Sequence, residues 1–289
     1  MEQVNKFSGH AIRATNVVKV FGDKAALKGV DLAIEPGEMV VLLGLSGSGK
    51  STFLRHVDGL ETPTSGTLNV LDQDLTTLSG SQMRKLRAKV GFVFQQFELV
   101  PSLSALENVL TGALSTLRGP RLGLATYPRR LRVKALETLD QVGLLELAYE
   151  RADTLSGGQQ QRVAIARALM QEPEILLADE PVASLDPESS RIVMSLIREI
   201  ARERNLTVLC SLHQVDLALS WADRIIGLRE GAVVLDTPTA GLGRAEVMEI
   251  YGKVAVDTQG HSAASAAPAT AVAEPQRAAA LAYSGAANS

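Results

Sequence analysis

The chain has 289 residues, 46% of them hydrophobic and 21% charged, so it is long and apolar enough to bury a sizeable core. Its 29 basic and 32 acidic side chains nearly cancel, which leaves no uniform charge to attract nucleic acid or an anionic membrane. Any phosphate binding must therefore depend on a local group of residues rather than on the net charge of the chain. Cys210, the single cysteine, cannot form an internal disulfide, and the first residues lack the apolar run of a signal peptide, so we expect a cytosolic address.

Short β-rich segments separated by turn signals run from residue 12 to residue 43 and predict strands of a compact sheet. Five further strands are expected at residues 90–94, 175–178, 207–211, 224–228 and 232–236. Apolar residues recur at helical spacing across residues 187–204, which predicts a helix between two of these strands. This alternation of strand and helix is typical of a parallel α/β sheet.

Two other regions have a different composition. Residues from about 104 to 170 carry helix formers with little strand character, which predicts a helical subdomain inserted between two sheet strands. Residues 254–289 are rich in Ala, Ser and Pro, and such a composition predicts a disordered tail after a domain that spans residues 11–253. The arginine-rich segment Arg118 to Arg132 fits either a solvated basic face or a contact with a membrane subunit or with lipid headgroups.

The motif G-x-x-x-x-G-K-S follows the apolar residues 39–43 and precedes a helical pattern, which is the context of a phosphate-binding loop. In such a loop, inward-pointing amide groups and a helix N-terminus bind phosphates. Lys50 can reach the β- and γ-phosphates, and the Ser51 hydroxyl can ligate Mg²⁺. The predicted nucleotide-binding residues are Gly44, Ser46, Gly47, Ser48, Gly49, Lys50, Ser51 and Thr52.

A second apolar run, residues 175–178, is followed by the acids Asp179 and Glu180. Open α/β sheets build ligand sites at the carboxyl ends of their strands. We therefore expect Asp179 to be a partner of Mg²⁺ and Glu180 to be the general base that polarises an attacking water. Taken alone, two such acids also fit a solvated turn or a helix cap, and the phosphate loop in the same chain favours the site.

Ser156, Gly157, Gly158 and Gln159 precede a helical pattern, which places them at a helix N-terminus and predicts a second anion site. The alternative is that these residues form the first turn of an ordinary helix and bind no anion. One chain has no evident use for two phosphate cradles so far apart in sequence, unless the second serves the nucleotide of a partner chain. Together with the two motifs above, the LSGGQ pentapeptide resembles the ATP-binding subunit of ABC transporters.

That resemblance spans about residues 12–236. It implies an α/β fold with a RecA-like P-loop nucleotide-binding core, an antiparallel β subdomain and an inserted helical subdomain. It also implies ATP and Mg²⁺ as cofactors and a homodimer that closes head to tail around ATP, with each LSGGQ facing the partner's phosphate loop.

The resemblance assigns roles to four more residues. Phe21 matches the aromatic residue that stacks on adenine, although Tyr is more usual there. Gln95 matches the glutamine that reaches the metal and the water and whose loop contacts the membrane subunit, with its neighbour Gln96 as the alternative. Asp186 lies in the loop that crosses the dimer interface, and His213 matches the histidine that contacts the γ-phosphate.

Besides the loop residues, the nucleotide-binding residues implied by the resemblance are Phe21, Ser156, Gly157, Gly158, Gln159 and Asp186. Two further sets complete the site prediction. The predicted catalytic residues are Glu180, His213, Gln95 and Lys50. The predicted metal ligands are Ser51, Gln95 and Asp179.

The segments SLHQVDLAL, PVASLDPES and TGALSTLRG are closest to ATPase subunits of importers of phosphonates, phosphite or phosphate. This similarity implies integral membrane permease subunits as partners at the cytoplasmic face of the inner membrane, where the chain is peripheral. It also implies an external solute-binding protein that acts through the permease, and no nucleic acid partner.

Three alternatives stay open from the sequence. One is the ATPase of another ABC branch, such as amino acid import or lipoprotein release. Another is a soluble DNA-repair or translation ATPase, although the chain shows neither a coiled-coil insertion nor a second cassette. The third is a non-catalytic regulatory cassette, against which Glu180 and His213 both argue.

Overall fold

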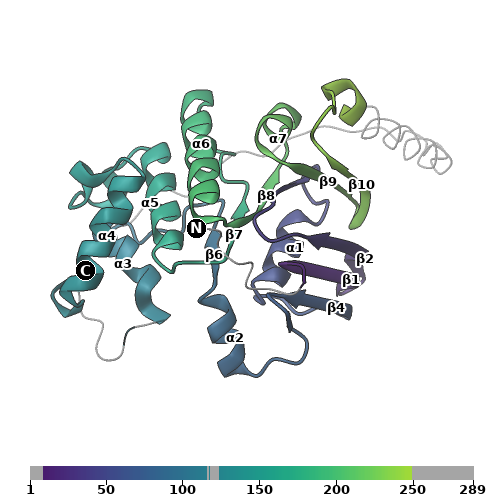
Figure 1. The fold of residues 1–289 in the computed structure, drawn as a ribbon, viewed down its shortest axis with the longest axis horizontal. Coiled ribbons are helices and arrows are strands. Elements are labelled where there is room, and N and C mark those ends of the chain that lie inside the picture. The colour runs from purple at the N-terminus through teal and green to yellow at the C-terminus, as the bar shows by residue number, and fades with distance from the viewer. Residues whose placement is uncertain (1–8, 116, 118–123, 249–289) are drawn as a thin grey trace, which may run out of the picture. The chain divides into compact units, whose positions relative to one another are not determined.

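The computed structural model describes residues 9–115, 117 and 124–248, all of which lie in one unit that ends at Tyr251 (Figure 1). The predicted tail, residues 254–289, and Arg118 and Arg121 of the arginine-rich segment lie outside the described residues. Within the described ranges, no helix is both long enough and apolar enough to cross a bilayer.

The larger sheet has six strands in the order β10-β9-β3-β8-β7-β6. The predicted phosphate loop and the predicted acidic pair lie at the ends of two of its strands. Its strands are β3 (Met39–Leu43), β6 (Val90–Val93), β7 (Ile175–Asp179), β8 (Thr207–Leu212), β9 (Arg224–Arg229) and β10 (Ala232–Pro238). All neighbours pair in parallel except β9 and β10. Strands β3, β6, β7 and β8 are buried along their whole length, as expected where both faces of a parallel sheet are covered. The predicted strands are confirmed.

A second, antiparallel sheet has the order β2-β1-β4-β5. It consists of β1 (Ile12–Phe21), β2 (Lys24–Ile34), β4 (Ser65–Val70) and β5 (Gln73–Asp74). A tight turn joins β1 to β2, and there Gly22 adopts a φ of 56°, a left-handed conformation that favours glycine. The strands expected in residues 12–43 are thus confirmed and divide between the two sheets.

The six-stranded sheet separates two apolar cores. In β3, Val40 and Leu42 belong to one core and Val41 and Leu43 to the other, because successive side chains of a strand point to opposite faces. The first core fills the space among the antiparallel sheet, the six-stranded sheet and α1 (Lys50–Val57), whose Phe53 is fully buried. The second lies under α6 (Pro187–Arg204) and α7 (Val215–Trp221). Burying one large apolar side chain contributes about 1.5–3 kcal/mol, so both cores anchor the site at the strand ends.

Helices occupy the chain between β6 and β7 and continue the second core (Figure 1). They are α3 (Ala105–Thr111), α4 (Arg129–Gln141) and α5 (Gly157–Leu169), with 3₁₀ turns at Gly112–Ser115, Leu124–Thr126, Leu145–Leu147 and Ala152–Thr154. A further helix, α2 (Gly80–Arg87), precedes β6. Ser104 caps α3 through a reciprocal pair of hydrogen bonds with Glu107, which satisfies the free amide groups of the first turn. The helical character predicted for residues 104–170 is confirmed over the described part of that stretch.

Candidate active site

The phosphate-loop motif links β3 to α1, so the predicted strand–loop–helix context is confirmed, with the helix beginning at Lys50 rather than at Thr52. Gly49 caps the helix with a φ of 107°, where a side chain would be strained, and an added Cβ would lie 2.8 Å from the Ala26 carbonyl oxygen. An added Cβ on Gly44 would collide with the Ser48 hydroxyl. Glycine is therefore required at both positions, and the loop wraps closely around the start of α1.

The Lys50 ammonium lies inside this loop, and its side chain is only 3% exposed. It donates hydrogen bonds to the carbonyl oxygens of Gly44 (2.7 Å) and Leu45 (3.2 Å). It also lies 3.3 Å from Glu180 Oε1, on the neighbouring loop after β7. This ion pair joins two motifs whose residues Lys50 and Glu180 are 130 positions apart in the sequence.

Asp179 ends β7 and is 5% exposed. Its Oδ1 accepts a hydrogen bond from the Ser51 hydroxyl (2.8 Å) and a second from the Ser211 hydroxyl (2.7 Å). The described residues contain no cluster of three His, Cys, Asp or Glu side chains that could hold a metal ion alone. A hydroxyl beside a carboxylate is nevertheless an oxygen donor set of the kind that Mg²⁺ prefers when phosphates complete its coordination. The residues therefore fit a Mg²⁺ ion bound together with nucleotide.

The predicted catalytic residues lie around the Glu180 carboxylate. Its Oε2 lies 3.5 Å from Gln95 Nε2 and 3.8 Å from His213 Nδ1, while Oε1 faces Lys50. The other three predicted catalytic side chains thus surround this one carboxylate. The backbone of Glu180 has a φ of 45°, a conformation that is uncommon for a residue with a side chain and that clusters at functional sites.

The loop after β6 distinguishes Gln95 from the alternative, Gln96. Only the Gln95 amide donates to Glu180 among the hydrogen bonds of the described residues. Arg167 of α5 holds the next part of this loop, because its guanidinium donates to the carbonyl oxygens of Phe97 (2.8 Å) and Glu98. Both of these loop residues have a positive φ, 59° and 51°. Sequence reasoning missed Arg167, since nothing in its helical pattern shows which loop it reaches.

The predicted second anion site lies at the start of α5, as expected. Ser156 is the N-cap residue and forms a capping box with Gln159, whose amide oxygen accepts from the Ser156 N–H at 2.8 Å. An added Cβ on Gly157 would touch Leu185, and one on Gly158 would lie 3.0 Å from the Ser189 hydroxyl, so this turn packs against the loop before α6 and against the first turn of that helix. Figure 1 shows α5 and α1 on different sides of β6 and β7. The helices that begin at the two predicted phosphate cradles therefore lie apart within one chain.

Two residues assigned by resemblance lie elsewhere. Phe21 ends β1 with 48% exposure, and the Lys19 ammonium lies 4.7 Å from its ring centroid. Asp186 caps α6 by accepting from the N–H groups of Glu188 and Ser189, both at 3.0 Å. Hydrogen bonding from Ser189, first through its side chain and then through its N–H, lowers the pKa of the Asp186 carboxyl. Asp186 thus has a structural role in fixing the loop before α6.

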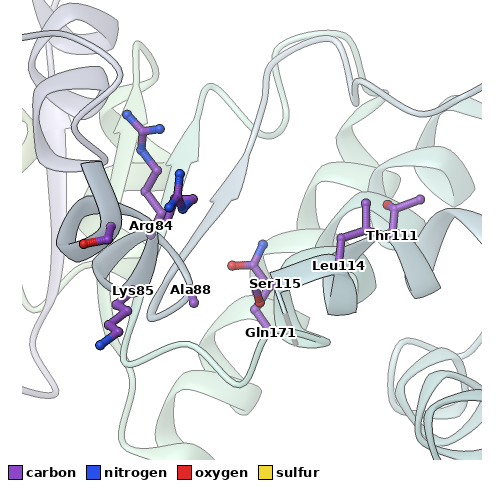
Figure 2. A pocket seen from close by; sticks show the side chains of 10 residues that line it. Arg84, Lys85, Ala88, Thr111, Leu114, Ser115 and Gln171 are labelled. Carbon is purple, nitrogen blue, oxygen red and sulfur yellow. The ribbon is translucent and has the colours of Figure 1, made fainter. Parts of the chain in front are cut away.

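A groove lies beside the Gln95 loop. A hollow of about 730 Å³ opens between α2 and the segment Thr111–Ser115, and Figure 2 shows Arg84 and Lys85 on one side of it and Thr111 and Leu114 on the other. A second hollow of about 370 Å³ shares four lining residues with it and reaches Asp58 and the Gln95 loop. Burial raises the pKa of Asp58 to about 7, and the charge of nearby Arg87 opposes that rise.

Comparisons with known proteins agree with this fold. The family model described as "ABC transporter" matches residues 27–183. In the solved structures, the dimeric ATP-binding cassette MJ0796, in a post-hydrolysis state with ADP and Pi, is similar to the chain with a TM-score of 0.70 and 39% identity over 80% of this chain and 100% of that one. The chain belongs to the ABC transporter family, as an ATP-binding cassette that hydrolyses ATP. The predicted family and fold class are confirmed.

Three relatives are ATP-binding proteins of importers. The "Phosphonates import ATP-binding protein PhnC" of Frankia casuarinae is 66% identical over 82% of this chain and 94% of the relative. The "Phosphate-import ATP-binding protein PhnC" of Mycolicibacterium smegmatis is 58% identical over 83% and 92% of the two chains. The "Hypophosphite import ATP-binding protein HtxD" of Stutzerimonas stutzeri is 46% identical over 83% and 71%.

Proposed function

We propose that this ATPase powers a membrane importer for phosphonates or for related phosphorus oxyanions such as phosphite and phosphate. The observation that carries the assignment is the 66% identity to a phosphonate-import subunit over 94% of that subunit's length. The phosphate-import and hypophosphite-import relatives support the same class of cargo. The proposal assigns no residue of this chain to cargo, because selection in this family lies with the external binding protein and the membrane subunit.

The phosphate loop is the proposed binding site for the ATP phosphates, with the Lys50 ammonium paired to the β- and γ-phosphates. Ser51 and Asp179 would hold Mg²⁺ with the Gln95 side chain, and the ion would neutralise phosphate charge when bound. The 2.8 Å hydrogen bond between the Ser51 and Asp179 oxygens supports this donor set. Phe21, half-exposed at the end of β1, presents a π-face to which adenine can stack.

Glu180 is the proposed general base for the attacking water. A positioned carboxylate accepts the proton as the water attacks the γ-phosphate. Lys50 lies 3.3 Å from this carboxylate, so nucleotide phosphates would compete with Glu180 for the ammonium and free the carboxylate for the water. His213 and Gln95, which flank Oε2, would contact the γ-phosphate and the water in this proposal.

We infer a homodimer in which the Ser156–Gln159 turn serves the ATP of the partner chain. Two features support the inference: α5, which begins at this turn, and α1, which begins at Lys50, lie on different sides of β6 and β7 in one chain, and Ser156 is exposed. Its helix N-terminus offers amide groups and a positive dipole to an anion. The dimeric state of the similar cassette MJ0796 is consistent with such an arrangement.

The groove beside the Gln95 loop is the proposed docking site for the permease, which would hold the chain peripherally at the cytoplasmic face of the membrane. Its smaller hollow adjoins the loop that presents Gln95 to Glu180 and shares lining residues with the larger one, so a permease segment in the groove can move that loop. A solute-binding protein would act on the chain only through the permease. The proposed catalytic domain covers residues 11–253, with residues 254–289 as a tail.

Uptake of radiolabelled alkylphosphonate and phosphite by a strain that lacks this chain tests the cargo assignment. We expect uptake to be lost and to be restored by the wild-type chain but not by the Glu180→Gln variant, while growth on abundant phosphate persists. Normal phosphonate uptake, with impaired uptake of an amino acid or defective lipoprotein sorting, would overturn the branch assignment.

A further inference from the structure

Ser211 lies beside the two acidic residues of the site but comes from a different strand. It is the partner of Asp179 in the parallel register between β7 and β8. The residue is fully buried, with 0% exposure. Its hydroxyl donates to Asp179 Oδ1 at 2.7 Å and accepts from the Glu180 N–H at 2.8 Å. One hydroxyl therefore contacts both the predicted metal ligand and the main chain of the predicted base.

The first of these hydrogen bonds orients the Asp179 carboxylate. Oδ1 accepts from both Ser51 and Ser211, and within the described part of the chain no hydrogen bond reaches Oδ2. Two donors on one oxygen fix the rotation of the carboxylate and leave Oδ2 as the oxygen available to a cation. Hydrogen bonds of this kind commonly set the orientation of a metal ligand, and their loss typically reduces metal affinity or activity about 10- to 100-fold.

The second hydrogen bond fixes the backbone at Glu180. That residue has a φ of 45°, which persists in a protein only when the surrounding structure holds it. Its N–H has the Ser211 hydroxyl as acceptor, and the direction of the N–H determines where the side chain leaves the backbone. Without this acceptor the Glu180 peptide is free to rotate toward a conformation more usual for a residue with a side chain, and the carboxylate would leave its place between Lys50 and His213.

We propose that Ser211 is a positioning residue for ATP hydrolysis, which couples the orientation of Asp179 to the backbone conformation of Glu180. The proposal rests on the assignment of Mg²⁺ to Asp179 and of general-base chemistry to Glu180. Ser211 contacts neither the nucleotide nor the water in this role, so its removal should affect catalysis and the contribution of Mg²⁺ while the phosphate loop still binds nucleotide.

The test compares Ser211→Ala and Ser211→Cys in the full chain. Alanine removes the hydroxyl, and cysteine keeps nearly the same shape but is a weaker donor and acceptor. Thr207→Val is the matched control: Thr207 lies on the same strand, is 3% exposed, and its hydroxyl accepts from the Gly37 N–H at 3.0 Å, at the opposite end of β8 from the site. Three quantities are measured: melting temperature, kcat at saturating Mg²⁺ and ATP, and affinity for a fluorescent ATP analogue with Mg²⁺ or with EDTA.

For Ser211→Ala we expect kcat to fall about 10- to 100-fold, with Ser211→Cys between alanine and wild type. Affinity for the analogue in EDTA should stay within about twofold of wild type, while the gain in affinity on adding Mg²⁺ shrinks by roughly the same factor as kcat. Thr207→Val should lower the melting temperature and leave kcat unchanged. The proposal is overturned if both Ser211 variants keep kcat and the Mg²⁺ gain, or if Thr207→Val loses kcat as much as they do. A wild-type chain that shows no Mg²⁺ gain would instead refute the metal assignment.

Discussion

The Glu180 carboxylate faces a cation on one oxygen and two potential hydrogen-bond donors on the other. An amide at this position keeps the shape and cannot take a proton from water, so Glu180→Gln should lower hydrolysis by about 10²- to 10⁴-fold, the usual contribution of a positioned base. ATP affinity should not fall, because the amide no longer competes with phosphates for Lys50, which lies 3.3 Å from the carboxylate. Single-turnover hydrolysis and equilibrium binding measure the two effects separately.

Glu188→Gln is a suitable control for this variant, since Glu188 is an exposed carboxyl in the first turn of α6. It should hydrolyse ATP at the wild-type rate. Near-normal turnover by Glu180→Gln would mean that another group accepts the proton.

Asp58 gives the stability of the fold a pH dependence. Burial raises the pKa of this carboxyl from 3.8 to about 7, so between these pH values the folded chain holds a proton that the unfolded chain has released. The free energy of unfolding therefore falls as pH rises from 3.8 to about 7, and it does not fall further because of this group above pH 7. Asp58→Asn cannot ionise and should be more stable than wild type at pH 8, by on the order of 2 kcal/mol, and nearly equal to it below pH 4.

Urea unfolding of the full chain at several pH values between 4 and 8 measures this difference. The exposed Asp140→Asn change in α4 is the control, and it should leave the slope of stability against pH unchanged. If Asp58→Asn is no more stable than wild type at pH 8, the Asp58 carboxyl is solvated or paired in the folded chain and its pKa is not raised.

At the scale of elements, α5 joins the LSGGQ turn at its start to the Gln95 loop near its end. Arg167 makes this connection through the Phe97 and Glu98 carbonyl oxygens. Arg167→Ala should release the loop, lower hydrolysis about 10-fold or more by displacing Gln95, and leave ATP affinity nearly unchanged, because a misplaced group near the chemistry costs rate before it costs binding. Hydrogen exchange at residues 95–98 should quicken in the same variant.

Arg162→Ala is the matched control for this change. Arg162 lies on the same helix and also donates to two carbonyl oxygens, those of Val142 (3.0 Å) and Gly143 (3.4 Å), but it ties α5 to the end of α4. Both variants should lose stability, by about 1.5–3 kcal/mol for a charged hydrogen-bonding group, and only Arg167→Ala should lose hydrolysis. Equal losses of hydrolysis would show that α5 matters only as a folded helix.

Local chemistry explains which parts of the site the sequence could predict. The phosphate loop was predictable because Gly44 and Gly49 serve a backbone shape that tolerates no side chain, and such requirements leave a fixed spacing in the sequence. Asp179 and Glu180 were predictable because acids end an apolar strand. Ser211 was not, because its role depends on the strand register that places it beside Asp179, and that register involves residues 32 positions apart.

At the scale of the whole molecule, one chain holds a phosphate loop at the start of α1 and an LSGGQ turn at the start of α5, and these two helices lie on different sides of β6 and β7 (Figure 1). If each turn serves the partner's ATP, a dimer of one Ser156→Arg chain and one Lys50→Ala chain has one site with both changes and one site with neither. Each homodimer has a change in both sites, so both should be inactive. Mixing them in equal amounts should restore about a quarter of wild-type hydrolysis, since half of the dimers are mixed and each has one intact site.

A second mixture makes this test specific for the arrangement of the sites. Lys50 and Glu180 lie 3.3 Å apart within one chain and therefore belong to the same half of a site. Mixing Lys50→Ala with Glu180→Gln places one change in each of the two sites, so this mixture should stay inactive even though mixed dimers form. Recovery in both mixtures would show that the two halves are not divided between chains as inferred. Recovery in neither, with mixed dimers demonstrated by differently tagged chains, would show either that each site lies within one chain or that two intact sites are required for turnover.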